Sequence, residues 1–353
     1  MAFSRNKISI FLSVVVSLSL IALLGCNDFF PKQTANVTIR NVHLFGTVVA
    51  FNSSSTLLAS GDQDGHILLS SLPKGSPVVN IKAHRDYVTG IGFLGEDQFV
   101  STGDDKRIVV WDTTGKMLRE IHTPSTITQM VMSIKGRIMI TGHEDGSVRL
   151  WKLPHLEQGG DYHLHRGKVL SVAYDAENQR FASSGSEGRV MVWKAGLEPR
   201  ELDKIYGNTA SLLFSSDGRT LFGGGWFKLY RWDVASGKVQ IFRTEHHGSI
   251  HRLSYTGDDN TLATISRHTD SAVYFLNSKN GAAERRFQSH DLCGADIAVS
   301  PDGCYLATTS DDSSVRIWYL DCKARKLTES RPAPAAELYD PGSLQSDPYG
   351  PPL

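Results

Sequence analysis

The sequence predicts an all-β protein built from a repeated unit, and two observations carry this prediction. Short runs rich in β-branched and aromatic residues alternate with Gly/Asp turns, as in Val88–Phe93, Gln98–Thr102 and Ile108–Trp111. A seven-residue segment that begins with an acidic residue and ends with Trp, seen clearly in Asp145–Trp151, recurs along the chain. No part of the repeated region carries a long helical period.

The repeated segment appears seven times. Four clear copies begin with an acid and end with Trp: Asp105–Trp111, Asp145–Trp151, Glu187–Trp193 and Asp312–Trp318. Three weaker copies fill the gaps: Asp64–Ser70, Trp226–Trp232 and Asp270–Leu276. The final positions are 70, 111, 151, 193, 232, 276 and 318, so their spacings are 41, 40, 42, 39, 44 and 42. This regularity predicts seven structural units of the same kind.

Each unit is expected to contain four strands. The second unit supplies three of them in the runs named above, and a fourth strand such as Val78–Ile81 joins one unit to the next. The turns Ser215–Gly218 and Ser300–Gly303 use residues that tolerate turn dihedrals or cap the backbone themselves.

These repeats resemble the WD-repeat family of β-propellers over about residues 39–321. The landmarks of that family are a Trp-Asp dipeptide and a Gly-His element. They correspond here to Trp111-Asp112 and Trp232-Asp233 for the dipeptide, and to His84, His165 and His290 for the histidine. The resemblance implies an all-β, seven-bladed β-propeller of four-stranded antiparallel blades around a central channel.

The same resemblance implies that the N-terminal part of the domain closes the ring. In this family the last blade takes its outermost strand from the N-terminus. Asn36–Val42 has the alternation of such a strand, and we expect it to pair with Ser314–Tyr319. Closure would remove an open sheet edge.

The resemblance also assigns a structural framework in which the loop acid accepts a hydrogen bond from a histidine. The histidine in turn bonds a Ser or Thr, which bonds the Trp indole. The residues assigned are His84, Ser101, Asp105 and Trp111 in the second unit, His165, Ser183, Glu187 and Trp193 in the fourth, and His290, Thr308, Asp312 and Trp318 in the seventh.

The third unit departs from this pattern and contains an apparent acid/base cluster, His143-Glu144-Asp145. Thr123 stands at the histidine position of this unit, while Thr141, Asp145 and Trp151 match the other framework positions. We therefore interpret Asp145 as structural and expect His143 and Glu144 to be solvent-facing turn residues.

The chain begins with the pattern of an export signal. Arg5 and Lys7 precede the apolar run Ile8–Leu24, which ends in Leu23-Leu24-Gly25-Cys26. This ending resembles the lipobox of bacterial lipoproteins. That resemblance implies a signal peptide over residues 1–25, a lipidated Cys26 and a membrane anchor in the bacterial cell envelope, with Asn27 favouring the outer membrane. The alternative is an uncleaved transmembrane anchor.

The remaining boundaries follow from these two patterns. Residues 26–35 are expected to link the anchor to a propeller at residues 36–322, and residues 323–353 to form a Pro-rich disordered tail. In a blade of this family Cys304 and Cys322 fall on the same, bottom end, which makes them candidates for a disulfide. The 37 basic and 37 acidic residues balance, which disfavours nucleic acid as a partner.

Motifs that carry chemistry are absent from the sequence. There is no G-x-S-x-G, no P-loop and no H-E-x-x-H, so we predict no enzyme and no cofactor. An enzyme whose residues converge on the central channel is the alternative. Two histidine groups raise the alternative of a metal site: His163/His165 and His246/His247/His251. One histidine of each of these groups is expected to serve the framework, so no metal is predicted.

The fifth unit breaks the repeat, because Trp226 holds the acid position, Phe227 follows it, and no framework histidine is present. One interpretation is that Trp226 packs into the vacated polar site. The other is that both rings are exposed on the top face, where aromatic and Arg side chains anchor interfaces. The second interpretation predicts a partner-binding patch made of Tyr87, Trp226, Phe227, Arg267 and His268. The expected function is a monomeric, non-catalytic platform for a protein partner.

Overall fold

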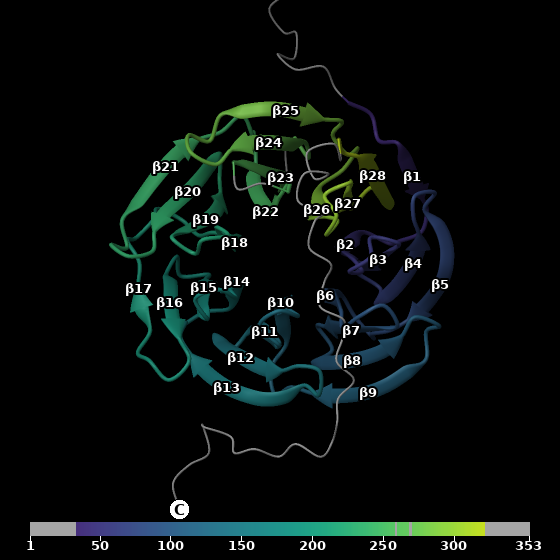
Figure 1. Cartoon of the computed structure of the whole chain (residues 1–353), viewed down its shortest axis with the longest axis horizontal. Helices are drawn as coiled ribbons and strands as arrows, with labels where there is room; N and C mark the ends of the chain where they lie inside the picture. The colour runs from purple at the N-terminus through teal and green to yellow at the C-terminus, as the bar shows by residue number, and fades with distance from the viewer. Residues whose placement is uncertain (1–32, 258–259, 268–269, 322–353) are drawn as a thin grey trace, which may run out of the picture. The chain divides into compact units, whose positions relative to one another are not determined.

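A computed structural model of the chain describes residues 33–257, 260–267 and 270–321. Over these ranges it contains 28 β-strands in seven four-stranded antiparallel sheets, arranged as the blades of one ring (Figure 1). The compact unit that holds them ends at Leu320. The predicted seven-bladed β-propeller is therefore confirmed. No helix in the described ranges is long and apolar enough to cross a bilayer.

Each blade contributes one strand to each of four concentric layers (Figure 1). The innermost strands are β2 (Gly46–Phe51), β6 (Val88–Phe93), β10 (Ile127–Ser133), β14 (Val169–Asp175), β18 (Ser211–Phe214), β22 (Ser249–Tyr255) and β26 (Gly294–Val299). The second strands are β3 (Leu57–Asp62), β7 (Gln98–Gly103), β11 (Ile138–His143), β15 (Arg180–Gly185), β19 (Thr220–Gly225), β23 (Thr261–Arg267) and β27 (Tyr305–Ser310). The third strands are β4 (His66–Ser71), β8 (Arg107–Asp112), β12 (Ser147–Lys152), β16 (Val190–Lys194), β20 (Lys228–Asp233), β24 (Val273–Asn277) and β28 (Ser314–Tyr319). The outer strands are β5 (Ser76–Lys82), β9 (Met117–His122), β13 (Glu157–His163), β17 (Arg200–Glu201), β21 (Val239–Arg243), β25 (Ala283–Phe287) and β1 (Val37–Arg40).

The N-terminal strand closes the ring as the sequence predicted. β1 pairs antiparallel with β28, with Val37 opposite Ile317 and Arg40 opposite Ser314. The seventh blade thus has the strand order β1-β28-β27-β26 and joins the two ends of the domain. Because β1 covers the edge of β28, the last blade has the same four strands as the others.

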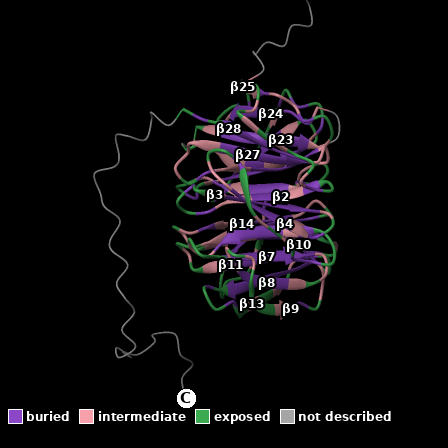
Figure 2. Ribbon diagram, turned by 90° about the vertical axis from the view of Figure 1, so that its right-hand side faces the viewer, coloured by how far each residue is buried: buried purple, intermediate pink, exposed green. Residues whose placement is uncertain are grey.

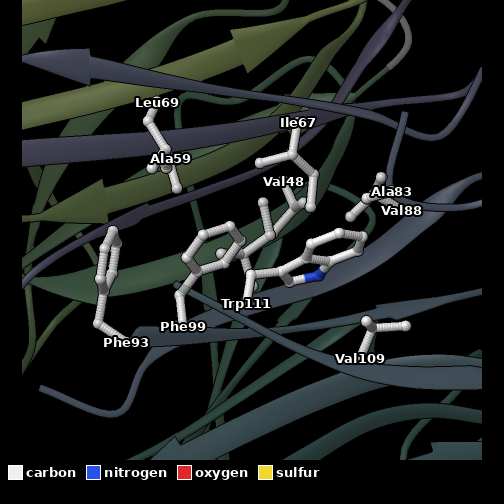
Figure 3. Packing of buried hydrophobic residues seen from close by; sticks show 11 residues of the cluster. Val48, Ala59, Ile67, Leu69, Ala83, Val88, Phe93, Phe99, Val109 and Trp111 are labelled. Carbon is white, nitrogen blue, oxygen red and sulfur yellow. The ribbon is translucent and has the colours of Figure 1, made fainter. Parts of the chain in front are cut away.

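The hydrophobic core is divided into seven clusters that lie between neighbouring blades rather than inside them. In the cluster between blades one and two, Ala59 and Leu69 of blade one pack against Phe99 and Trp111 of blade two (Figure 3). Figure 2 shows the consequence: the inner strands are buried, whereas the loops at the two edges of the ring and outer strands such as β9 and β13 are largely exposed. Burying a Trp such as Trp111 contributes roughly 3 kcal/mol, so each blade depends on its neighbour for its stability.

The loops define two faces that are used below. The top face carries the loops between second and third strands and the loops that lead into the innermost strands; the bottom face carries the remaining loops. Bottom turns such as Ser215–Gly218 are held locally, with Ser215 Oγ 2.7 Å from Asp217 Oδ1 and Gly218 at φ 66°. Cys304, also in a bottom turn, is disulfide-bonded. Its proposed partner Cys322 lies outside the described residues.

Candidate functional site

The polar framework of blade two has the geometry that the family resemblance implies. His84 Nδ1 lies 2.9 Å from Asp105 Oδ1, and His84 Nε2 lies 2.7 Å from Ser101 Oγ. The Trp111 indole N–H donates to the same Ser101 Oγ over 2.9 Å. His84 and Ser101 are buried, so each of these bonds satisfies a polar group that water does not reach.

Blades four and seven contain the histidine bonds but not the expected tryptophan bond. His165 lies 2.6 Å from Glu187 and 2.7 Å from Ser183. His290 lies 2.9 Å from Asp312 and 2.7 Å from Thr308.

The tryptophan part of the expectation for these two blades is wrong. Trp193 Nε1 has no hydrogen-bond partner among the described residues, and the Trp318 N–H donates instead to the Gln33 carbonyl over 3.2 Å. Gln33 lies just before β1, so the ring closure itself supplies the acceptor for Trp318.

The expectation that His143 faces solvent is also wrong. His143 is fully buried at the end of β11, with Nε2 2.8 Å from Thr141 Oγ1 and Nδ1 3.1 Å from the Ser125 carbonyl. Trp151 donates to the same Thr141 Oγ1 over 2.9 Å. His143 thus does in blade three what His84 does in blade two, but it comes from β11 itself because Thr123 holds the usual histidine position.

The environment of His143 keeps its imidazole neutral. Burial, together with the nearby Arg149 guanidinium, lowers the pKa of His143 to about 4. Asp145 binds Ser147 and Arg149, 3.1 Å from the latter, while Glu144 is exposed. His143 and Asp145 are therefore structural, and the hydroxyl groups beside them, Thr141 and Ser147, are part of the same hydrogen-bonded framework.

Two further blades contain the framework: sequence reasoning did not assign it in blade one, and in blade six it left open which of His246 and His247 takes part. In blade one His43 lies 2.6 Å from Ser60 and 3.3 Å from Asp62. In blade six His246 lies 2.8 Å from Thr264 Oγ1 and 3.4 Å from the Asp270 carboxylate.

A spacing rule in the sequence could have found both sites. The histidine precedes its Ser or Thr by 17 residues in blades one and two and by 18 in blades four, six and seven. In blade one the framework acid is Asp62 at the end of β3. It is not Asp64, the residue with which the repeated segment of this blade begins.

Blade five fills its missing histidine site with a tyrosine. Tyr230 on β20 is buried, its ring lies against Gly225, and its hydroxyl donates to the Tyr206 carbonyl over 3.3 Å. Trp232 is fully buried and donates to the Asp203 carbonyl over 3.0 Å. The interpretation that Trp226 packs into this polar site is therefore wrong.

Trp226 and Phe227 instead form an exposed pair on a two-residue hairpin. They join β19 to β20, with Gly225 paired to Lys228 on either side of them. Trp226 is 47% exposed and Phe227 is 41% exposed, and their ring centroids lie 5.7 Å apart. Phe227 has a φ of 55°, in the left-handed region that a bulky residue rarely adopts.

The structure separates the predicted five-residue patch into two parts. Trp226 forms a β-bridge with Ser249, which pairs with Arg267, so Arg267 lies near the aromatic pair; its guanidinium is engaged 3.2 Å from Asp311. Tyr87 is exposed but precedes β6, on the side of the ring opposite β19 (Figure 1). His268 lies outside the described residues.

The titratable groups at the channel are mostly bound to other parts of the ring. Asp296 on β26 lies 3.4 Å from Arg252 on β22, and its other oxygen accepts the Val49 N–H over 3.0 Å. At the top face, burial, together with the nearby Asp86 carboxylate, raises the pKa of Asp104 to about 6.

The described residues contain no group of three or more His, Cys, Asp or Glu side chains placed to hold a metal ion. His163 is exposed on the outer strand β13, whereas both ring nitrogens of His165 are engaged in the framework. These two histidines therefore do not form a chelating pair.

Fold and framework together define a seven-bladed β-propeller with buried histidine-centred polar sites. The family model "WD domain, G-beta repeat" (WD40) matches residues 75–112, 115–152, 157–194 and 283–319. The chain therefore carries WD40 repeats. The matched segments end at the third strands of blades two, three, four and seven, while blades one, five and six are recognised from the sheet topology.

Curated relatives share this repeat at low identity. The "Guanine nucleotide-binding protein subunit beta" of Oryza sativa subsp. japonica is 26% identical over 235 residues, covering 60% of this chain and 60% of that protein. "Striatin-4" of Homo sapiens is 23% identical over 83% of this chain and 44% of its own length. "WD repeat-containing protein 55" of Arabidopsis thaliana is 20% identical over 77% of this chain and 80% of that protein. The chain thus spans less than two thirds of the rice and human proteins.

Proposed function

We propose that this protein is a non-catalytic platform that binds a protein partner through the top face of blade five. The observation that carries the proposal is the exposed Trp226–Phe227 pair. Two large rings project from a hairpin whose second residue is held in a left-handed conformation. Exposed aromatic side chains are the residues most enriched at the energetic centres of interfaces.

The turn that carries the pair has a left-handed residue in every blade. This residue is Gly65, Gly146 or Gly188 in blades one, three and four, and Lys106, Ser271 or Ser313 in blades two, six and seven. Phe227 holds the position in blade five and accepts a strain of about 1 kcal/mol that Gly would avoid. Because three other blades share this strain, the exposure of the two rings, and not the strain, distinguishes blade five.

The relatives are consistent with a partner-binding role. The rice protein is by its name a subunit of a guanine nucleotide-binding protein and so belongs to an assembly. We extend only this general role, and not any particular partner, to the present chain. A channel-sited enzyme is disfavoured because the buried Arg252 and Asp296 are held by each other and by backbone groups.

We further propose that Cys26 carries a lipid and anchors the platform in the bacterial cell envelope. The support is the sequence Leu23-Leu24-Gly25-Cys26 after an apolar run. Several acyl chains hold a protein durably on a bilayer, at about 0.8 kcal/mol per buried methylene. Replacing Cys26→Ser should abolish metabolic labelling with an alkyne fatty acid and move the protein to the soluble fraction. Retained labelling would contradict this anchor.

The platform itself is tested by crosslinking in intact cells that express the tagged full chain. We expect the double variant Trp226→Ala/Phe227→Ala to lose the crosslinked partner bands that the wild type gives, with an unchanged melting temperature. The matched control is Met117→Ala/Leu118→Ala, a neighbouring pair on outer strand β9 that is 48% and 45% exposed. Equal loss in both variants, or loss in neither, would refute the proposed surface.

A further inference from the structure

The top face between blades four and five contains a cavity of about 520 Å³. Its origin is a shortened outer strand. β17 has only two residues, Arg200 and Glu201, which pair with Val192 and Met191. Leu202 still donates its N–H to the Val190 carbonyl over 2.9 Å, but the Asp203 N–H donates to the Gly237 carbonyl of blade five. The chain thus leaves blade four after Leu202, and Lys204 and Ile205 of this crossing segment line the cavity.

The two acids that line this cavity are already paired. Glu187 lies 2.6 Å from the framework His165, and one oxygen of Glu201 lies 2.9 Å from Arg189 Nε. The other oxygen of Glu201, Oε1, is buried and has no hydrogen-bond partner within the described part of the chain. The cavity therefore presents an unsatisfied acceptor, which favours a ligand that brings an N–H group.

The cavity also presents two cations whose charge is not matched. Arg166 and Lys204 line it and are exposed. Neither has an ion pair or a side-chain hydrogen bond with any residue that the structure describes, whereas the third lining cation, Arg189, is neutralised by Glu201. Because the buried His165 is neutral and leaves the charge of Glu187 in place, the three cations and two acids of the lining give a net charge of +1, which suits the cavity to a carboxylate.

A chain of contacts leads from the cavity to the aromatic hairpin of blade five. Ile205 lines the cavity, and the next residue, Tyr206, is 92% exposed. The Tyr206 carbonyl accepts the Tyr230 hydroxyl, and the Tyr230 ring lies against Gly225, immediately before Trp226. The polar cavity of blades four and five and the exposed aromatic side chains of blade five thus belong to the same top-face region.

From this juxtaposition we infer that the partner binds as an extended acidic peptide segment. An Asp or Glu carboxylate of the partner enters the cavity between Arg166 and Lys204, a partner backbone N–H donates to Glu201 Oε1, and an apolar side chain packs on Tyr206 and Trp226. This inference rests on the proposed function and names the chemistry of the partner.

An anionic membrane surface would also be attracted by cations beside aromatic rings, but the top face opposes it. Asp86, Asp104 and Glu144 lie close together on that face, and their mutual effect helps to raise the pKa of Asp104. A bilayer laid across this face would bring these carboxylates against anionic headgroups. A narrow peptide reaches the cavity of blades four and five without covering blades two and three.

The inference is tested by fluorescence anisotropy with the full chain and two labelled peptides. One peptide carries two Glu residues followed by Leu and Phe, and the other has Gln in place of each Glu. We expect the wild type to bind the acidic peptide at least tenfold more tightly, with an affinity that falls as salt rises. Equal affinity for the two peptides, or no binding of either, would overturn the inference.

Charge reversal at the cavity tests whether the preference for the acidic peptide arises there. The double variant Arg166→Glu/Lys204→Glu should lose the preference for the acidic peptide and keep its affinity for the Gln peptide. The matched control, Lys116→Glu/Lys152→Glu, changes the net charge equally with two exposed lysines on the bottom face and should keep the preference. A membrane is the other possible source of anions. If the wild type sediments with phosphatidylglycerol vesicles, the Arg166→Glu/Lys204→Glu variant does not, and neither protein binds the acidic peptide, the site would be assigned to a membrane.

The crosslinking experiment separates the two proposals. If capture depends on Trp226 and Phe227 but charge reversal changes neither capture nor peptide binding, the platform stands and the acidic-peptide inference falls. If the acidic peptide binds through Arg166 and Lys204 but capture in cells does not depend on the aromatic pair, the proposed function of that pair falls alone.

Discussion

The imidazole of His84 and the carboxylate of Asp105 meet at 2.9 Å across 21 residues of sequence. This contact joins the loop that enters blade two to the turn between its second and third strands. Although burial would raise the pKa of Asp105, the hydrogen bond with His84 lowers it to about 2. The pair is thus a structural clamp at the top face, repeated with variations in four other blades.

Removing the histidine of this clamp should destabilise the domain. His84→Ala leaves Ser101 and Asp105 without their buried partner, and an orphaned buried polar group costs about 1–3 kcal/mol. We expect a loss of about 2 kcal/mol in the free energy of unfolding, measured by urea denaturation. The control His163→Ala removes an exposed histidine from outer strand β13 and should change the free energy of unfolding little. A similar loss in both variants would show that the clamp contributes nothing specific.

The buried His143 should make stability depend on pH in a defined window. Its folded pKa of about 4 lies below the ordinary value of 6.5, so the unfolded chain takes up a proton first as the pH falls. The stability that His143 contributes is therefore present above pH 6.5, declines between pH 6.5 and 4, and declines no further below that.

The variant His143→Gln should reduce the pH dependence of unfolding in this window. The wild type should lose about 2–3 kcal/mol more than the variant between pH 7 and pH 4, as measured by urea unfolding at a series of pH values. The exposed His163→Gln serves as the control and should retain the wild-type slope. Parallel curves for wild type and His143→Gln would contradict the assigned burial of the neutral imidazole.

The fold could be predicted from sequence because its signal is repeated. The seven landmarks forty-odd positions apart and the strand-turn alternation give β6, β7 and β8 to within one or two residues. Closure by β1 also follows, since Val37 and Ile39 alternate with polar residues. These features depend on local patterning, which a single chain displays directly.

The framework was less predictable because the same polar site can be filled from different positions. Gly103 and Gly185 leave space for the histidine of their blade; a Cβ there would lie 2.5 Å from His84 Nδ1 and 2.4 Å from His165 Nδ1. In blade three the equivalent position holds His143 itself, and in blade five Tyr230 enters from the third strand. Which solution a blade uses depends on packing in three dimensions, so counting from Trp alone misassigned His143.

The cavity between blades four and five could not be predicted for a related reason. The sequence from Lys194 to Ser211 is as long as that of other blade connections, and nothing in its pattern shows that β17 stops after Glu201. The exposed state of Trp226 likewise depended on whether another ring filled the site of the missing histidine. Only the position of Tyr230 decides that question.

Substitutions in the closing strand β1 should change the stability of the domain by an amount that depends on which face of the strand carries them. Ile39 packs into the cluster between blades seven and one, whereas Thr38 points outward and is exposed. We expect Ile39→Asp to lower the free energy of unfolding by about 1–3 kcal/mol, because a partly buried apolar side chain is lost and a charge enters an apolar site. Thr38→Asp should cost less than about 1 kcal/mol.

Deleting residues 34–43 should reduce the stability of the whole domain, and a normal melting curve for that deletion would contradict closure by β1.

Phe227 provides a test in which stability and binding move in opposite directions. Its φ of 55° strains a Phe but not a Gly, so Phe227→Gly should keep or raise the free energy of unfolding by up to about 1 kcal/mol. The same substitution removes a ring of the aromatic pair and should weaken partner capture. Lys106→Gly is the matched control, since Lys106 has a φ of 66° at the corresponding turn of blade two and lies away from the pair. That variant should gain similar stability and retain capture. If Phe227→Gly destabilised the domain as a core substitution does, the ring would be a packing element and the strained hairpin would need no functional explanation.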